Sequence, residues 1–163
     1  MWPGLLDRGL LDFAVIAQAV DLSKYNYLEL PESDTWGVVM RRDSFLAQKK
    51  AVDIDDLLDL PLIVSRQGLR EDIPRLLGEK ADRLRVVTTI NLAYNGGIFV
   101  REGLGYLLIF DRLVGTGAES DLCFRPLTPA LETKLFVIWK KYQVFSPAAK
   151  VLLEEMKTNS GKP

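Results

Sequence analysis

The sequence predicts an α/β protein in which helices cover both faces of an open sheet. Six short apolar runs have the length of strands, and most of them are continuous rather than alternating. A continuous apolar strand is typical of a sheet that is buried on both faces. Segments with the apolar spacing of helices lie between these runs. The predicted strands span residues 13–17, 36–40, 62–65, 86–90, 106–110 and 135–139.

Three predicted helices have recognisable starts. Asp53 is a suitable N-cap for a short helix over the residues that follow it. Apolar residues within 69–77 recur at i, i+4, i+7 and i+8, and Pro74 fits such a helix in its first turn. Near the end of the chain, Ser146 followed by Pro147 is typical of an N-cap with a first-turn proline.

One segment, VVTTINLAYNGGIFVREG, is consistent with two structures. Asn95-Gly96 favours a β-hairpin, with strands before and after it. The alternative ends a strand near Ile90, caps a helix at Asn91 and continues that helix to about Glu102. Two glycines inside such a helix cost about 1 kcal/mol each relative to alanine, so the pattern alone leaves both structures open.

The glycine pair in REGLGYLLIF marks the end of a helix rather than a phosphate loop. A dinucleotide-binding loop follows a strand and opens a helix, whereas Gly103 and Gly105 follow helical residues and precede a strand. The third glycine of that motif would stand at residue 108, which is Leu108. A glycine after a helix closes the last turn in the left-handed conformation. A nucleotide-binding enzyme therefore loses its best candidate motif.

Composition excludes several classes of function. The 163 residues include no histidine, which removes Ser-His-Asp and Cys-His catalysis. Cys123 is the single cysteine, which excludes an intrachain disulfide and Cys/His zinc sites. We expect Cys123 to be a small core residue. The net charge of −1 offers no basic face for nucleic acid. No apolar run is long enough for a membrane span and no signal-peptide layout is visible, so we expect a cytoplasmic protein.

Three stretches, taken in order, resemble LysR-type transcriptional regulators. LLDRGLLDFAVI (residues 5–16) is similar to a helix end, a glycine and a strand of that family. WGVVMRRDSFLAQKKAVDIDDLLDLPLIVSRQ (residues 36–67) continues with a strand, a turn, a short helix and a proline-led strand. GIFVREGLGYLLIF (residues 97–110) resembles a helix, glycine turn and strand, which favours the helix over the hairpin at Asn95-Gly96.

The resemblance implies a two-lobed effector-binding domain of the type II periplasmic-binding-protein kind. Residues 1–33 and 128–163 would form the first lobe, and residues 34–127 an inserted second lobe. A small anionic metabolite would bind in the cleft, with no cofactor and no catalysis, in a homodimer or higher oligomer. DNA would be bound only by a helix-turn-helix domain that is absent from this chain, and no membrane contact is expected.

The resemblance also implies that the first lobe is incomplete. The opening strand-helix-strand of that lobe would precede Met1, and residues 13–17 would then present an unpaired strand edge where a partner could add. Two rival functions remain open at this point. One is a fragment of a two-lobed solute-binding protein for transport, and the other is an α/β enzyme, for which no catalytic residues can be named.

Ligands of open α/β sheets bind beyond the carboxyl ends of the strands, which selects the candidate residues. The Ser65 hydroxyl could donate to a ligand oxygen, Gln67 could donate and accept, and Arg66 could hold a carboxylate through two parallel hydrogen bonds. The alternatives are a solvated surface arginine for Arg66 and a helix cap for Ser65. The remaining candidates that follow strands are Asn91 and Asp111, either of which could instead cap a helix, and Ala17 and Gln18 in the other lobe.

Two acidic clusters need a separate interpretation. Asp53, Asp55 and Asp56 lie close together, as do Glu71 and Asp72, and paired carboxylates can serve acid–base chemistry or bind a divalent metal. At the start of a short helix such residues more often stabilise the positive end of the helix. We therefore expect a structural role for them and no metal site.

Overall fold

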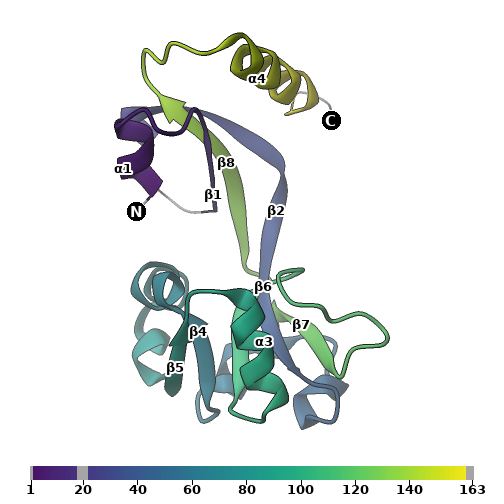
Figure 1. Cartoon of the computed structure of the whole chain (residues 1–163). Helices are drawn as coiled ribbons and strands as arrows, with labels where there is room; N and C mark the ends of the chain where they lie inside the picture. The colour runs from purple at the N-terminus through teal and green to yellow at the C-terminus, as the bar shows by residue number, and fades with distance from the viewer. Residues whose placement is uncertain (1, 18–21, 161–163) are drawn as a thin grey trace. The chain divides into compact units, whose positions relative to one another are not determined.

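The chain divides into two compact units. A computed structural model describes residues 2–17 and 22–160 (Figure 1). Unit 1 combines the described residues up to Asp34 with those from Thr133 onward, and unit 2 is formed by Thr35–Glu132. The 17-residue strand β2 (Tyr25–Arg41) contributes to both. The two ends of unit 2 meet, because the Trp36 backbone N–H donates to the Leu131 carbonyl oxygen at 2.9 Å.

The sheet of unit 2 has the strand order β2-β6-β4-β5. Strand β4 (Leu62–Ser65) pairs in parallel with both β5 (Val86–Ile90) and β6 (Tyr106–Phe110). Strand β2 is antiparallel to β6 and to β7 (Leu122–Thr128), and the two-residue β3 (Val52–Asp53) runs parallel to β7. The predicted α/β organisation is confirmed for this unit.

Successive residues of the central strand enter opposite cores, which explains the continuous apolar runs. Leu62 and Val64 belong to a core that includes Trp36 and Leu57, whereas Ile63 belongs to a second core that includes Val100. Leu62, Ile63 and Val64 are fully buried. Cys123 is buried in the first core, as expected of a small apolar residue.

The short helix after Asp53 has the predicted cap. The 3₁₀ helix η3 (Ile54–Leu57) begins after Asp53, whose carboxylate accepts from the Asp55 backbone N–H at 2.9 Å. The Asp56 carboxylate reaches back to the Asp53 backbone N–H at 3.0 Å, which completes a capping box. The 3₁₀ helix η2 (Phe45–Gln48) precedes it and is capped by Ser44.

Pro74 lies where a proline can be accommodated. Helical turns begin at Arg66, continue as the π-helical segment η4 (Gly68–Asp72) and end in α2 (Ile73–Leu77), followed by the 3₁₀ helix η5 (Gly78–Arg83). The wider turn is seen in the bond from the Ile73 N–H to the Gly68 carbonyl. Pro74 is the second residue of α2, as predicted, but helical turns precede it, so the wider π-helical turn accommodates the residue that has no N–H to donate.

The Asn95-Gly96 segment is a helix, so the hairpin alternative is wrong. Helix α3 spans Ala93–Arg101, and its N-cap residue is Leu92 rather than the predicted Asn91. After α3 the Gly103 N–H donates to Val100 O and the Leu104 N–H donates to Phe99 O, both at 3.0 Å. Gly103 has a φ of +77°. These two bonds form a Schellman cap, which confirms the structural role of this glycine.

Unit 1 is a smaller α/β assembly. Strand β1 (Ala14–Ile16) pairs antiparallel with β8 (Glu132–Lys140), which also neighbours β2. Strand β1 ends the described strand order, in agreement with the expected strand edge. Successive residues of β8 again face opposite sides, with Ile138 beside Leu6 and Val137 beside Leu153. The remaining elements are α1 (Trp2–Asp7), the 3₁₀ helix η1 (Leu22–Lys24) and α4 (Pro147–Ser160), the last capped by Ser146 as predicted.

The strands of the structure agree in part with the predicted ones. The bounds of β4, β5 and β6 are those predicted, β1 is shorter, and β2 and β8 are longer. Strands β3 and β7 were not predicted.

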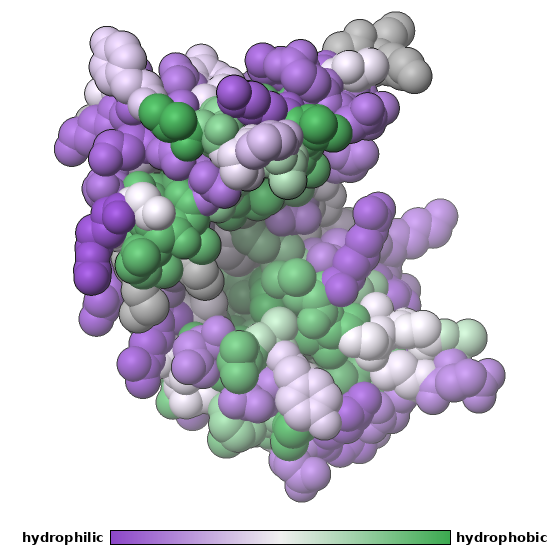
Figure 2. Space-filling view, turned by 45° about the horizontal axis from the view of Figure 1, so that its top comes forward, coloured by the Kyte–Doolittle hydropathy of each residue, from purple (hydrophilic) through white to green (hydrophobic). Residues whose placement is uncertain are grey.

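Within the described residues no helix is long and apolar enough to cross a membrane. On the face shown in Figure 2, apolar side chains form patches among polar ones on both units.

Candidate functional site

The candidate residues of unit 2 follow three parallel strands and therefore share one edge of the sheet. Strands β5, β4 and β6 lie side by side in Figure 1, and Ser65 at the end of β4 is level with Ile90 at the end of β5. Val64 is level with Leu108 of β6. The residues that follow, from Ser65 to Gln67 together with Asn91 and Asp111, consequently line what we call the carboxyl edge of unit 2.

Ser65 connects strand β4 to the helix that follows. Its Oγ accepts from the Gly68 backbone N–H at 2.8 Å, which caps the first turn. Gly68 is buried, and a Cβ at this position would lie 2.8 Å from Ser65 Oγ and 3.6 Å from the Trp36 ring. The predicted capping role of Ser65 is thus present, and its hydroxyl proton is still able to donate to a ligand.

Arg66 and Gln67 form the exposed first turn of that helix. Within the described residues the Arg66 guanidinium has no hydrogen bond or ion pair, so all five of its N–H donors are available. The first N–H groups of a helix also point toward its N-terminus. This corner of the carboxyl edge is therefore rich in donors, which suits an anion.

Asn91 lies at the same edge without acting as a cap. It is exposed, and α3 begins two residues later behind Leu92, which provides no side-chain cap bond. The interpretation of Asn91 as a helix cap is wrong, because the backbone turns into the helix one residue later than the sequence pattern indicates. In the described part of the chain its amide has no hydrogen-bond partner.

Asp111 ties the end of β6 to the middle of β2. Its backbone N–H donates to the Thr35 carbonyl oxygen at 2.9 Å, and its Oδ1 accepts from the Arg112 backbone N–H at 2.8 Å. No helix follows in the described residues 111–121, which form turns, so the interpretation of Asp111 as a helix cap is also wrong. Its carboxylate instead closes a local turn.

Two aromatic residues, which were not predicted as site residues, lie at the carboxyl edge. The rings of Trp36 and Phe110 lie 4.3 Å apart at 53°, and the two residues are opposite each other on β2 and β6. Trp36 is buried and its ring lies under Gly68. Phe110 is half-buried and borders the polar side chains, whereas Trp36 belongs to the core beneath them. The sequence gives no local signal for this pair, because β2 and β6 are distant along the chain and their antiparallel pairing brings the two rings together.

The comparisons with known proteins identify the family. The family model described as the LysR substrate binding domain matches residues 3–161. The chain belongs to this family. No protein of curated function matches its sequence.

Solved structures of LysR-family proteins have the same fold. The effector-binding domain of QuiR, in complex with shikimate, has a TM-score of 0.82 at 18% identity and covers 98% of this chain and 76% of its own. The regulatory domain of CcmR from Synechocystis, in complex with 2-PG, has a TM-score of 0.78 at 19% identity, with coverages of 99% and 79%. HinK of Pseudomonas aeruginosa has a TM-score of 0.80 at 18% identity, and the chain covers 57% of it.

Membership in the LysR substrate-binding domain family decides between the predicted functions. The predicted fold class, a type II periplasmic-binding-protein-like α/β domain, is confirmed. The family favours a regulator over a solute-binding protein for transport, and it is a regulatory ligand-binding family rather than an enzymatic one.

Members of both acidic clusters in this LysR-family domain form helix caps or ion pairs. Lys49 Nζ lies 2.6 Å from both Asp56 carboxylate oxygens, and this hydrogen bond holds the pKa of Asp56 below its ordinary value. Asp72 is buried and forms an ion pair with Arg75 at 3.2 Å. Among the residues that the structure describes, no group of acidic, cysteine or histidine side chains could hold a metal ion.

The two candidate residues of unit 1 are less well defined. Ala17 is half-buried and follows β1, as predicted. Gln18 lies outside the described residues. The candidate site is therefore described on unit 2 alone, at its carboxyl edge.

Proposed function

We propose that this chain is the ligand-sensing domain of a LysR-type regulator and that it binds a small anionic metabolite at the carboxyl edge of unit 2. The observation that carries the proposal is the Arg66 guanidinium, which is exposed, has no internal partner among the described residues, and follows the capped turn at Ser65. A guanidinium binds a carboxylate or phosphate through two parallel hydrogen bonds.

The other side chains of the carboxyl edge would complete the site. Ser65 supplies a hydroxyl proton, Gln67 and Asn91 supply amides that donate and accept, and the half-buried Phe110, packed on the buried Trp36, supplies an apolar surface. The Asp111 carboxylate would repel a second negatively charged group of the ligand close to β6. Two similar domains, those of QuiR and CcmR, were solved with the small molecules shikimate and 2-PG.

Ligand binding would control the activity of the intact regulator. The two units would act as the two lobes, with residues 1–33 and 128–163 in the first and residues 34–127 in the second. A ligand that binds one arrangement of a domain better than another shifts the population toward that arrangement. A homodimer or higher oligomer would pass this shift to a helix-turn-helix domain outside this chain, in the cytoplasm.

A thermal-shift panel of organic acids and phosphate esters tests the proposal. A ligand at 100 times its Kd adds about 2.7 kcal/mol to the free energy of unfolding. Arg66→Ala should then weaken binding by about 10-fold to 100-fold, because a hydrogen bond to a charged group contributes about 1.5–3 kcal/mol. The matched control is Arg85→Ala, since the Arg85 side chain is also exposed and its guanidinium has no partner among the described residues. Arg85 precedes β5, at the opposite edge of the sheet.

Three results would contradict the proposal. The first is the absence of any stabilising ligand in a broad anionic panel. The second is equal loss of affinity in the Arg66 and Arg85 variants, which would place the anion elsewhere. The third concerns regulation: a ligand that binds the intact regulator without changing its affinity for operator DNA would separate binding from control.

A further inference from the structure

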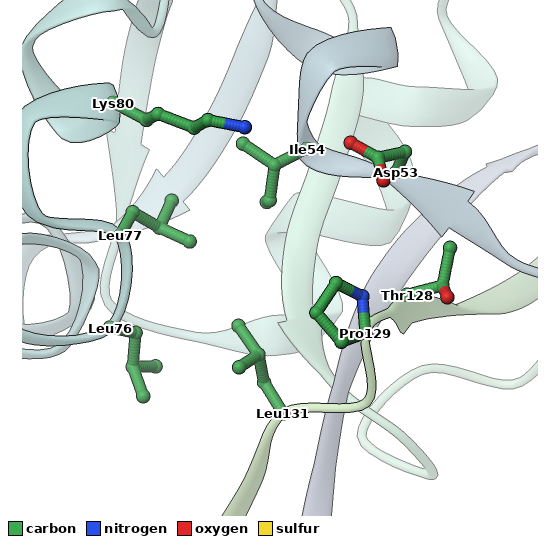
Figure 3. A pocket seen from close by; sticks show the side chains of 8 residues that line it. All are labelled: Asp53, Ile54, Leu76, Leu77, Lys80, Thr128, Pro129 and Leu131. Carbon is green, nitrogen blue, oxygen red and sulfur yellow. The ribbon is translucent and has the colours of Figure 1, made fainter.

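Unit 2 contains a pocket away from the carboxyl edge. It lies between the end of α2, the helices η3 and η5, and the residues that follow β7, and its volume is about 180 Å³ (Figure 3). None of its lining residues belongs to the carboxyl edge described above. They are Asp53, Ile54, Leu76, Leu77, Lys80, Thr128, Pro129 and Leu131.

The interior of the pocket is apolar. In Figure 3 the side chains of Ile54, Leu76, Leu77, Pro129 and Leu131 surround the same space from three parts of the chain. A dry cavity of about 150 Å³ with similar walls holds a benzene molecule in another protein. A single six-membered ring or a branched aliphatic group therefore fits, whereas typical ligand sites of about 300–1,000 Å³ accept much larger molecules.

The polar side chains at the rim are the Asp53 carboxylate, the Thr128 hydroxyl and the Lys80 ammonium, and the ammonium carries donors alone. The Asp53 carboxylate already accepts from the backbone N–H groups at the start of η3. Lys80 extends across the rim, and its Nζ forms an ion pair with Asp55 at 2.8 Å. Both side chains of that pair are about half exposed or more, at 47% and 61%, so it contributes little to stability. An ammonium has three N–H donors, and Lys80 can direct the others to a ligand.

We propose that this pocket is a second ligand site, which takes a small cyclic or branched aliphatic carboxylic acid. The ring lies among Leu76, Leu77 and Leu131, and the carboxylate accepts from Lys80 Nζ. This inference does not rest on the function proposed for the carboxyl edge. Either site can exist without the other, because they share no residue.

Three probes with one ring and different head groups test the inference. Cyclohexanecarboxylate, cyclohexylmethanol and cyclohexylmethylamine are titrated at millimolar concentration into the isotope-labelled chain. We expect saturable shifts of the Ile54, Leu77 and Leu131 amide signals, with the carboxylate binding about tenfold more tightly than the alcohol, a difference of about 1.4 kcal/mol. The amine should bind more weakly than the alcohol, because its charge faces Lys80.

Two variants separate the head group from the ring. Lys80→Gln should remove the tenfold preference for the carboxylate and leave the affinity for the alcohol unchanged, while Lys50→Gln, at an exposed lysine outside the pocket, should change neither. Leu131→Phe fills the pocket and should weaken all three probes. Because that variant can also disturb the fold, the Lys80→Gln result is the deciding one.

Several outcomes would overturn the inference. These are the absence of saturable shifts at the pocket residues, shifts confined to Ser65, Arg66 and Asn91, a preference for the amine, or a carboxylate preference that survives in Lys80→Gln. Shifts at the carboxyl edge alone would support the proposed function and reject the second site, so the two proposals fail separately.

Discussion

Replacing Gly105 with alanine should destabilise unit 2 strongly, although the change adds one methyl group. A Cβ at this position would lie 2.2 Å from the Pro61 carbonyl oxygen and 3.0 Å from the Pro61 carbonyl carbon, where ordinary contacts begin at 3.4 Å. The obstacle is backbone rather than the end of a flexible side chain, so β6 must move by about 1 Å to relieve it.

The movement would break the first bond between β6 and β4. The Tyr106 N–H donates to this same Pro61 oxygen at 2.8 Å. The lost hydrogen bond costs about 1–3 kcal/mol and the forced displacement about 1–3 kcal/mol. We therefore expect the free energy of unfolding to fall by about 2–6 kcal/mol.

Gly103→Ala is the matched control, two residues away. Gly103 has a φ of +77°, and a Cβ there would meet nothing within 4 Å. The cost is then that of the left-handed conformation, about 1–2 kcal/mol. Urea unfolding followed through the amide signals of Leu107 and Leu108, which lie in unit 2, measures both variants. A loss in Gly105→Ala no greater than that in Gly103→Ala would refute the steric argument.

Three further predictions concern single side chains. Ser65→Ala should lower the free energy of unfolding by about 1 kcal/mol through loss of the cap on Gly68, and Ser65→Asp should restore it in urea unfolding. The hydrogen bond from Lys49 lowers the pKa of Asp56 in the folded chain. The ionised Asp56 therefore contributes its full stabilisation above the unfolded-state pKa of about 3.9, and this contribution disappears as the pH falls through the lower folded-state pKa. Asp56→Asn should flatten the stability profile in that acidic range, and an unchanged acid slope would contradict this assignment. Cys123 should react with a thiol reagent only as fast as the chain opens, because it is buried, so rapid labelling of the folded chain would show that the core is open.

The continuous apolar strands could be predicted from the sequence, whereas the strands or parts of strands that carry prolines and charges could not. Strands β4, β5 and β6 are short apolar runs, and in β4 alternate residues enter two different cores, which is the pattern that a continuous run indicates. The first half of β2 carries Pro31 and several charged residues, and β7 contains Pro126. Their pairing depends on partners distant in the sequence, such as β8, so no local pattern could reveal them.

The carboxyl edge was partly predictable for the same reason. Parallel strands end at a common edge, so Ser65, Arg66 and Asn91 could be placed together from the strand ends alone. The local roles of Asn91 and Asp111 could not be predicted. Asn91 lies one residue before the helix N-cap, and the Asp111 carboxylate accepts from the backbone N–H of its neighbour Arg112. Trp36 was missed because nothing in the sequence near it states that β2 runs antiparallel to β6.

The backbone bond between Trp36 and Leu131 makes unit 2 a closed module within a longer chain. A segment whose two ends meet can be excised or transplanted without stretching the backbone that receives it. It also imposes an order on biosynthesis, because all of Thr35–Glu132 leaves the ribosome before the rest of β8 and α4 do. Unit 2 can therefore fold before the second segment of unit 1 has been synthesised. Until then the first segment of unit 1 remains unfolded on the nascent chain.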